Sequence, residues 1–156
     1  MQQKFLYKDP KKQKQSYSGK KKAHTFKAQA IIHYKTKQIL SLCFSKGSIH
    51  DFKLFKKNIK LIPVGCFILA DKGYQGIKEI YSRSIVPMKA KRKEKLDPLF
   101  KQINAEINTR RIGIEHVFGA LKRFKILSNC YRNRGQRIGL RFNLIAGIYN
   151  LELSKK

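Results

Sequence analysis

The chain has 156 residues and a mass of 18.2 kDa, and its 36 Lys and Arg outnumber nine Asp and Glu to give a formal net charge of +27. This length suits a single domain over 1–156, and a hydrophobic fraction of 42% is sufficient for a core. So large a positive charge favours a polyanionic partner. No signal peptide and no apolar run of about 18 residues is present, so we expect a cytoplasmic protein without a membrane partner.

The first half of the chain predicts a hairpin and then a helix. Residues 1–22 are polar and lysine-rich, and we expect a basic, partly irregular lead-in there. Alternation in HTFKAQAIIH (24–33) predicts a strand, and QILSLCFS (38–45) predicts its antiparallel partner. Apolar residues at helical spacing then predict a helix from a cap at Ser48 to about Asn58.

The second half predicts one more strand and two helices. The apolar run CFILA (66–70) is typical of a buried strand, and Asp71 follows at its carboxyl end, where open sheets tend to bind ligands. Asp97-Pro98 predicts the start of a helix that runs to about Phe124, and a second helical pattern covers 136–152. Together these elements indicate an α/β fold with a mixed sheet flanked by helices.

Two acidic residues are conspicuous in so basic a chain. Asp71 and Glu115 both adjoin apolar segments, and carboxylates on such a scaffold are suited to hard metal ions that act on a polyanion. Arg111, Glu115 and Lys122 lie at i, i+4 and i+11, which places them on one stripe of the predicted helix. The stripe could hold a metal and a phosphate, or it could be a solvated face of salt bridges.

Five segments in order give the chain a family resemblance: YSGKKKAHTFK, GSIHDFKLFK, LADKGYQG, IEHVFGALKRFKIL and YRNRGQRIGLRFNLIAGIYN. They resemble the DDE-type transposases of bacterial insertion sequences, in the branch related to Harbinger elements, from about Pro10 to Leu153. The resemblance implies a ribonuclease-H-like fold and divalent ions, Mg²⁺ with Mn²⁺ as the alternative. It further implies phosphodiester hydrolysis and strand transfer at transposon ends, by a homo-oligomer assembled on DNA in the bacterial nucleoid.

The same resemblance assigns residues of the site. Asp71 matches the second acid of the catalytic triad and Glu115 the third, and both are expected to bind metal. Arg111 and Lys122 match the basic positions of the R-x3-E-x6-K signature and are expected to contact phosphate. That signature often has Tyr three residues before the Arg, where this chain has Asn108.

The first acid of the family is expected about nine residues before the position of Pro10, which falls on Met1. We therefore expect an N-terminally truncated catalytic domain, with its first strand missing or shortened and its catalysis impaired. Asp51 is the substitute candidate for a metal ligand, and its alternative role is to cap or orient its helix. A second reading is a non-catalytic remnant that still binds DNA, and a third is a basic RNA-binding protein.

Several basic side chains are expected to contact the DNA backbone and to position it without reading its sequence. These residues are Lys20, Lys21, Lys22, Arg132, Arg134 and Arg137.

Overall fold

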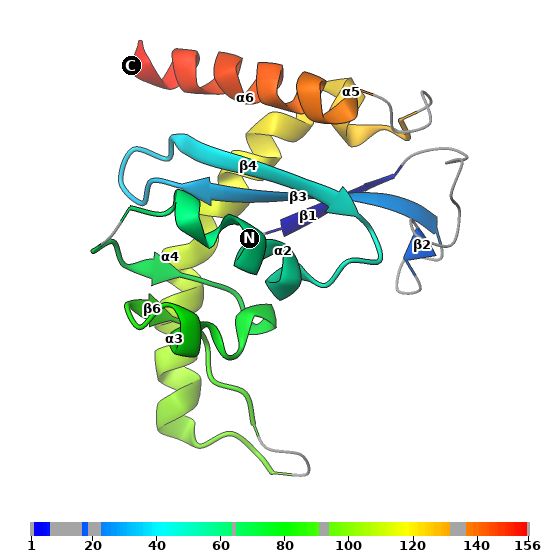
Figure 1. Cartoon of the computed structure of the whole chain (residues 1–156). Coiled ribbons are helices and arrows are strands. Elements are labelled where there is room, and N and C mark those ends of the chain that lie inside the picture. Colours follow the sequence, from blue (N-terminus) through cyan, green and yellow to red (C-terminus); the bar gives the residue numbers. More distant parts are fainter. Residues whose placement is uncertain are drawn as a thin grey trace. The chain divides into compact units, whose positions relative to one another are not determined.

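The computed structural model describes residues 2–6, 17–18, 23–63, 65–90, 94–131 and 137–155 (Figure 1). The chain forms two compact units. The first unit consists of Met1–His50 and Ile114–Lys156, and the second unit is Asp51–Gly113. The two units are described in turn.

An antiparallel sheet is the centre of the first unit. It contains β1 (Gln2–Leu6), β2 (Tyr17–Ser18), β3 (Ala23–Ile32) and β4 (Ile39–Lys46). The long strand β3 pairs with the other three, and β1 and β4 lie on its two sides (Figure 1). The β3–β4 hairpin confirms the strands expected at 24–33 and 38–45. Strand β1 lies within 1–22, where the sequence QQKFL has no alternation that predicts it.

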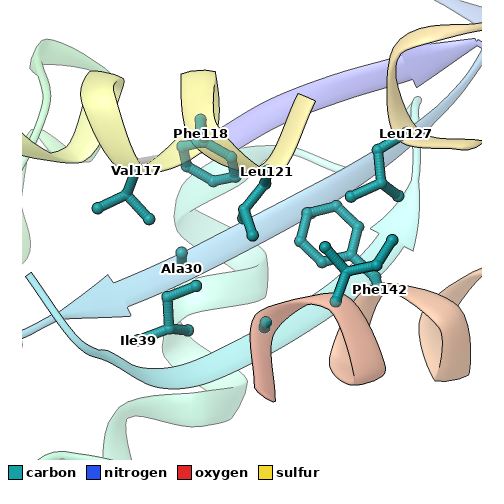
Figure 2. Close-up of a cluster of buried hydrophobic side chains, with 10 residues drawn as sticks. Ala30, Ile39, Val117, Phe118, Leu121, Leu127 and Phe142 are labelled. Carbon is teal, nitrogen blue, oxygen red and sulfur yellow. The ribbon is translucent and has the colours of Figure 1, made fainter. Parts of the chain in front are cut away.

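Helices cover one face of this sheet. They are the end of α4 (Pro98–Lys122), α5 (Lys125–Ser128) and α6 (Ile138–Ser154). Figure 2 shows Phe118 and Leu121 of α4 and Phe142 of α6 in one cluster with Ala30 of β3. Phe118, Leu121 and Phe142 have no exposed surface, because the period of two in β3 and the helical period of α4 and α6 direct apolar residues to one layer.

Asn150 of α6 joins this helix to the sheet. Its Oδ1 accepts a hydrogen bond from the backbone N–H of Ile39 at 2.9 Å, and its Nδ2 donates to the carbonyl of Ile39 at 2.9 Å. One amide side chain therefore satisfies both polar backbone groups at the start of β4, where the side chain of Ile39 is 8% exposed.

The second unit contains short elements around an aromatic core. They are α2 (Asp51–Asn58), the 3₁₀ turn η1 (Ile59–Leu61), β5 (Ile68–Leu69), the 3₁₀ turn η2 (Lys72–Tyr74), α3 (Ile77–Ile80), β6 (Ser84–Ile85) and the first part of α4. Phe55, Tyr74 and Ile77 are buried with Ala70 in one cluster. Phe55 and Tyr74 meet edge to face, with ring centroids 5.7 Å apart, which is a preferred arrangement of aromatic pairs.

Two expected boundaries in the second unit are wrong. Helix α2 begins at Asp51, three residues after the cap predicted at Ser48. The strand predicted over 66–70 is reduced to Ile68–Leu69, which pairs in parallel with β6, and Phe67 just before it is 75% exposed. An apolar run predicts a buried strand with a neighbour on each side, but in the described part of the sheet β5 has one neighbour and is two residues long.

The start of α4 confirms the sequence prediction. The Oδ1 of Asp97 accepts a hydrogen bond from the backbone N–H of Leu99 at 2.8 Å, and Pro98 is the first helical residue. The helix ends at Lys122, and α5 follows after a short break.

The elements together make a mixed α/β protein, as the sequence predicted. The sheets are small, one antiparallel and one parallel, and each of the two units also contains helices. No helix in the described ranges has the length and apolar character needed to cross a membrane.

Candidate active site

Asp71 lies just after β5, in extended backbone with φ −82° and ψ 163°. Its Oδ1 accepts a hydrogen bond from the backbone N–H of Lys72 at 2.6 Å, so the carboxylate caps the 3₁₀ turn η2. The Asp71 side chain keeps 43% of its surface exposed. The turn that follows ends at Gly76, whose φ of +82° favours glycine, whereas Gly73 lies within η2 and its φ is not positive.

Arg111 of α4 forms an ion pair with Asp71. Its Nη1 is 3.5 Å from Asp71 Oδ1, and the Arg111 side chain is only 11% exposed. The same Nη1 donates to Oδ1 of Asn108 at 3.2 Å, one helical turn earlier. The guanidinium is therefore oriented from its own helix and balances the charge of the Asp71 carboxylate. Arg111, which the family resemblance led us to expect at a phosphate, contacts the candidate catalytic acid Asp71 in this structure.

Asn104 fixes α4 to the segment after β6. Its Oδ1 accepts from the backbone N–H of Met88 at 2.8 Å, and its Nδ2 donates to the Met88 carbonyl at 3.0 Å. Asn104, Asn108 and Arg111 are separated by four and three residues, so they share one face of the helix. Sequence reasoning named Asn108 only as a departure from the residue usual in the family and missed Asn104, although extending the Arg111 stripe by two turns toward the amino end would have found it.

Glu115 and Lys122 lie further along α4, in the part that belongs to the first unit, and both are exposed. Val117 and Leu121 of the same helix are buried in the core of the first unit. Glu115 thus offers an open carboxylate on a rigid element. Asp51, the substitute candidate, is the first residue of α2 and is half-buried.

Comparison with known proteins decides the family. The sequence model for DDE superfamily endonucleases matches residues 4–150. The chain belongs to this family. It is 52% identical over 148 residues to the probable transposase for insertion sequence element IS702 of Microchaete diplosiphon. That alignment covers 94% of this chain and 54% of the relative, so the chain spans about half the length of the curated relative it matches. No solved structure matches the chain.

Membership of the DDE endonuclease family confirms the resemblance found in the sequence. It also raises the question of whether the residues of the site could bind a divalent metal ion. Within the part of the chain that is described, no group of three or more His, Cys, Asp and Glu side chains is close enough to hold a metal ion. The donor chemistry of the two candidate acids nevertheless fits a hard divalent cation, because Asp71 and Glu115 both present accessible carboxylate oxygens.

The structure describes only some of the basic residues that the sequence predicts to bind DNA. Lys20, Lys21, Lys22, Arg132 and Arg134 lie outside the described residues. Arg137 is exposed directly before α6, with a left-handed φ of 56°. Arg141, one turn into α6, donates from Nη1 to the hydroxyl of Tyr131 at 2.7 Å and is thereby tied to a buried aromatic residue.

Proposed function

We propose that the chain is the catalytic part of an insertion-sequence transposase. In this proposal it has a ribonuclease-H-like fold, cleaves phosphodiester bonds at transposon ends and joins the freed strand to target DNA. The observation that carries the proposal is the match to the DDE endonuclease family over residues 4–150, which includes both candidate acids. The positive charge of the chain supports a DNA substrate.

Asp71 and Glu115 would hold the divalent cation, with Mg²⁺ as the first candidate and Mn²⁺ as the second. A cation of this kind lowers the pKa of bound water and stabilises the oxygen that leaves phosphorus. The residues of the chain supply the rest. Arg111 compensates the charge of Asp71, whose Oδ1 is also held by the backbone of Lys72. Lys122 and Arg137 are exposed, and we assign them to the phosphate backbone.

The wider setting follows from the same proposal. The protein would assemble as a homo-oligomer on transposon ends and target DNA in the bacterial nucleoid. A second candidate function is a DNA-binding protein without catalysis, which the net charge of +27 supports on its own.

A strand-cleavage assay tests the proposal. The purified chain is incubated with end-labelled duplex DNA and Mg²⁺, and the Asp71→Asn and Glu115→Gln variants are compared with it. Each substitution should lower the cleavage rate by about 100-fold or more, because a lost metal ligand removes several kcal/mol of transition-state stabilisation.

Glu106→Gln is the matched control, since Glu106 is an exposed carboxylate on the same helix that pairs with Arg110. It should leave the rate unchanged. Mg²⁺-dependent cleavage that survives both Asp71→Asn and Glu115→Gln contradicts the assignment of these acids. DNA binding without any cleavage favours the second candidate function.

A further inference from the structure

Phe67, just before β5, has a more exposed side chain than any other large apolar residue in the described ranges. It keeps 75% of its surface in contact with solvent, whereas Phe118 and Phe142 keep none. An exposed phenylalanine ring forfeits the burial that usually stabilises aromatic residues. Such a ring is therefore a candidate contact for a ligand that has a flat apolar face.

The loop that carries Phe67 is fixed by side chains from the segment before β6. The hydroxyl of Tyr81 donates to the carbonyl of Cys66 at 2.7 Å and lies 3.3 Å from the carbonyl of Pro63. Nη1 of Arg83 donates to the carbonyl of Gly65 at 2.9 Å. Gly65 itself has φ +91°, a backbone conformation that L residues adopt only with strain. The ring is thus presented by an anchored backbone, so a ligand pays little ordering entropy on contact.

Arg83 also gives the ring a positive neighbour. Its Cζ is 5.8 Å from the centroid of Phe67, within the range of a cation–π contact. Arg83 is itself exposed. An aromatic ring and an exposed guanidinium together offer the two contacts that a nucleotide needs, a surface for its base and a charge for its phosphate.

Phe67 and Asp71 flank the strand β5 within the second unit. Four residues of extended chain span about 13 Å, the length of about four stacked bases. A DNA strand that passes the candidate catalytic acid could therefore reach the ring with a base only a few nucleotides from the scissile phosphate.

We propose that Phe67 and Arg83 form a stacking site for an unpaired nucleobase of a DNA strand near the cleavage point. This inference rests on the proposed function, because it takes DNA as the substrate. Stacking needs an exposed base face, so the Phe67 ring binds single-stranded or frayed DNA and contributes nothing to the binding of intact duplex.

The absence of tryptophan from the chain gives a direct test. Phe67→Trp introduces one fluorophore at the proposed site and keeps an aromatic surface. Its emission should be quenched on titration with oligo-dT, and the affinity should match that of the unchanged chain. Phe67→Leu should bind oligo-dT about 5- to 150-fold more weakly, because stacking contributes about 1–3 kcal/mol per base. Its affinity for blunt duplex of the same length should stay the same.

Tyr34 is the matched control in the first unit. It is 56% exposed and has Nζ of Lys37 4.7 Å above its ring, so it is another exposed aromatic residue beside a cation. Tyr34→Trp should show little quenching, and Tyr34→Leu should bind oligo-dT like the unchanged chain. Circular dichroism melts of all four variants verify folding, which changes at such exposed positions should leave intact.

Unchanged oligo-dT affinity in Phe67→Leu overturns the inference, as does equal quenching of the two tryptophan variants or a chain that binds no oligo-dT. The cleavage assay separates this inference from the proposed function. Cleavage that depends on Asp71, together with no effect of Phe67→Leu, removes the stacking site alone. Quenching of Phe67→Trp without any cleavage by the chain removes the catalytic proposal and leaves the stacking site.

Discussion

Arg111 Nη1 lies 3.5 Å from Asp71 Oδ1, forty residues earlier in the chain, and Asn108 holds the same nitrogen from one turn away. The pair brings the candidate catalytic acid and the middle of α4 together within the second unit. A carboxylate with a guanidinium partner is oriented and compensated before any cation arrives. The family signature predicted a basic residue at this position, and the structure adds the acid that it contacts.

Replacement of Arg111 by Ala should lower the free energy of unfolding by about 1–2 kcal/mol. The change removes an ion pair whose acidic member is 43% exposed, which contributes little, and it also removes the packing of a long side chain that is 11% exposed. Urea denaturation followed by circular dichroism measures this. Arg110→Ala, which removes an exposed pair with Glu106, should cost less than about 0.5 kcal/mol. Equal losses in the two variants would show that the Arg111–Asp71 contact adds nothing.

Asn150→Ala should destabilise the first unit by about 2–3 kcal/mol. The substitution leaves the backbone N–H and C=O of Ile39 without their partners, and part-buried polar groups are costly to leave unsatisfied. Asn143→Ala on the same helix is the comparison, because Asn143 is exposed and alanine has the higher helix propensity. Its unfolding free energy should be unchanged or slightly higher. Thermal melts of the two variants that coincide would contradict the role given to Asn150.

Phe142→Ala should cost about 3–5 kcal/mol of stability. Phe142 has no exposed surface and packs against Phe44 with ring centroids 5.5 Å apart, so the change creates a cavity in the core. Leu144→Ala, two residues along α6 at a site 66% exposed, should change stability by less than about 1 kcal/mol. A soluble, cooperatively folded Phe142→Ala protein with unchanged denaturation midpoint would rule out this description of the core.

The three cysteines should differ in reactivity toward a thiol reagent such as a disulfide dye. Burial raises the pKa of the Cys43 thiol, and a hydrogen bond with Ser41 opposes this in part, whereas Cys66 and Cys130 are exposed. The thiolate is the reactive form, so a raised pKa leaves less of it at a given pH and keeps Cys43 protonated to higher pH than an ordinary thiol. The time course of thiol modification at pH 8 should show two thiols that react fast and one that reacts slowly. Cys43→Ser should remove the slow phase only.

Much of the fold could be predicted because its signals are local. The alternation in β3, the Asp97-Pro98 cap of α4 and the apolar period of α6 each follow from residues close together in the chain. Strand β1 carries no such signal, since QQKFL becomes a strand through its pairing with β3. The short β5 was overpredicted because an apolar run does not reveal how many neighbours a strand has.

The sequence predicts which residues belong to the candidate site, but it does not predict which of their side chains contact one another. The carboxyl end of an apolar run indicated Asp71, and the family signature indicated Arg111 and Glu115. That Arg111 is directed at Asp71 depends on long-range packing, which a helical stripe cannot show. Asn108 departs from the residue usual in the family, and its contact with Arg111 became visible only with the side chains in place.

The two hydrogen bonds from Asn104 reach only backbone atoms of Met88, so the docking of this loop on α4 does not depend on which side chain stands at position 88. Substitutions at position 88 are therefore tolerated, as long as Asn104 and the backbone N–H of residue 88 are kept. Proline is the exception, because it has no backbone N–H to donate to Oδ1 of Asn104. The exposed side chain at position 88 can in this way vary while α4 holds the loop in place.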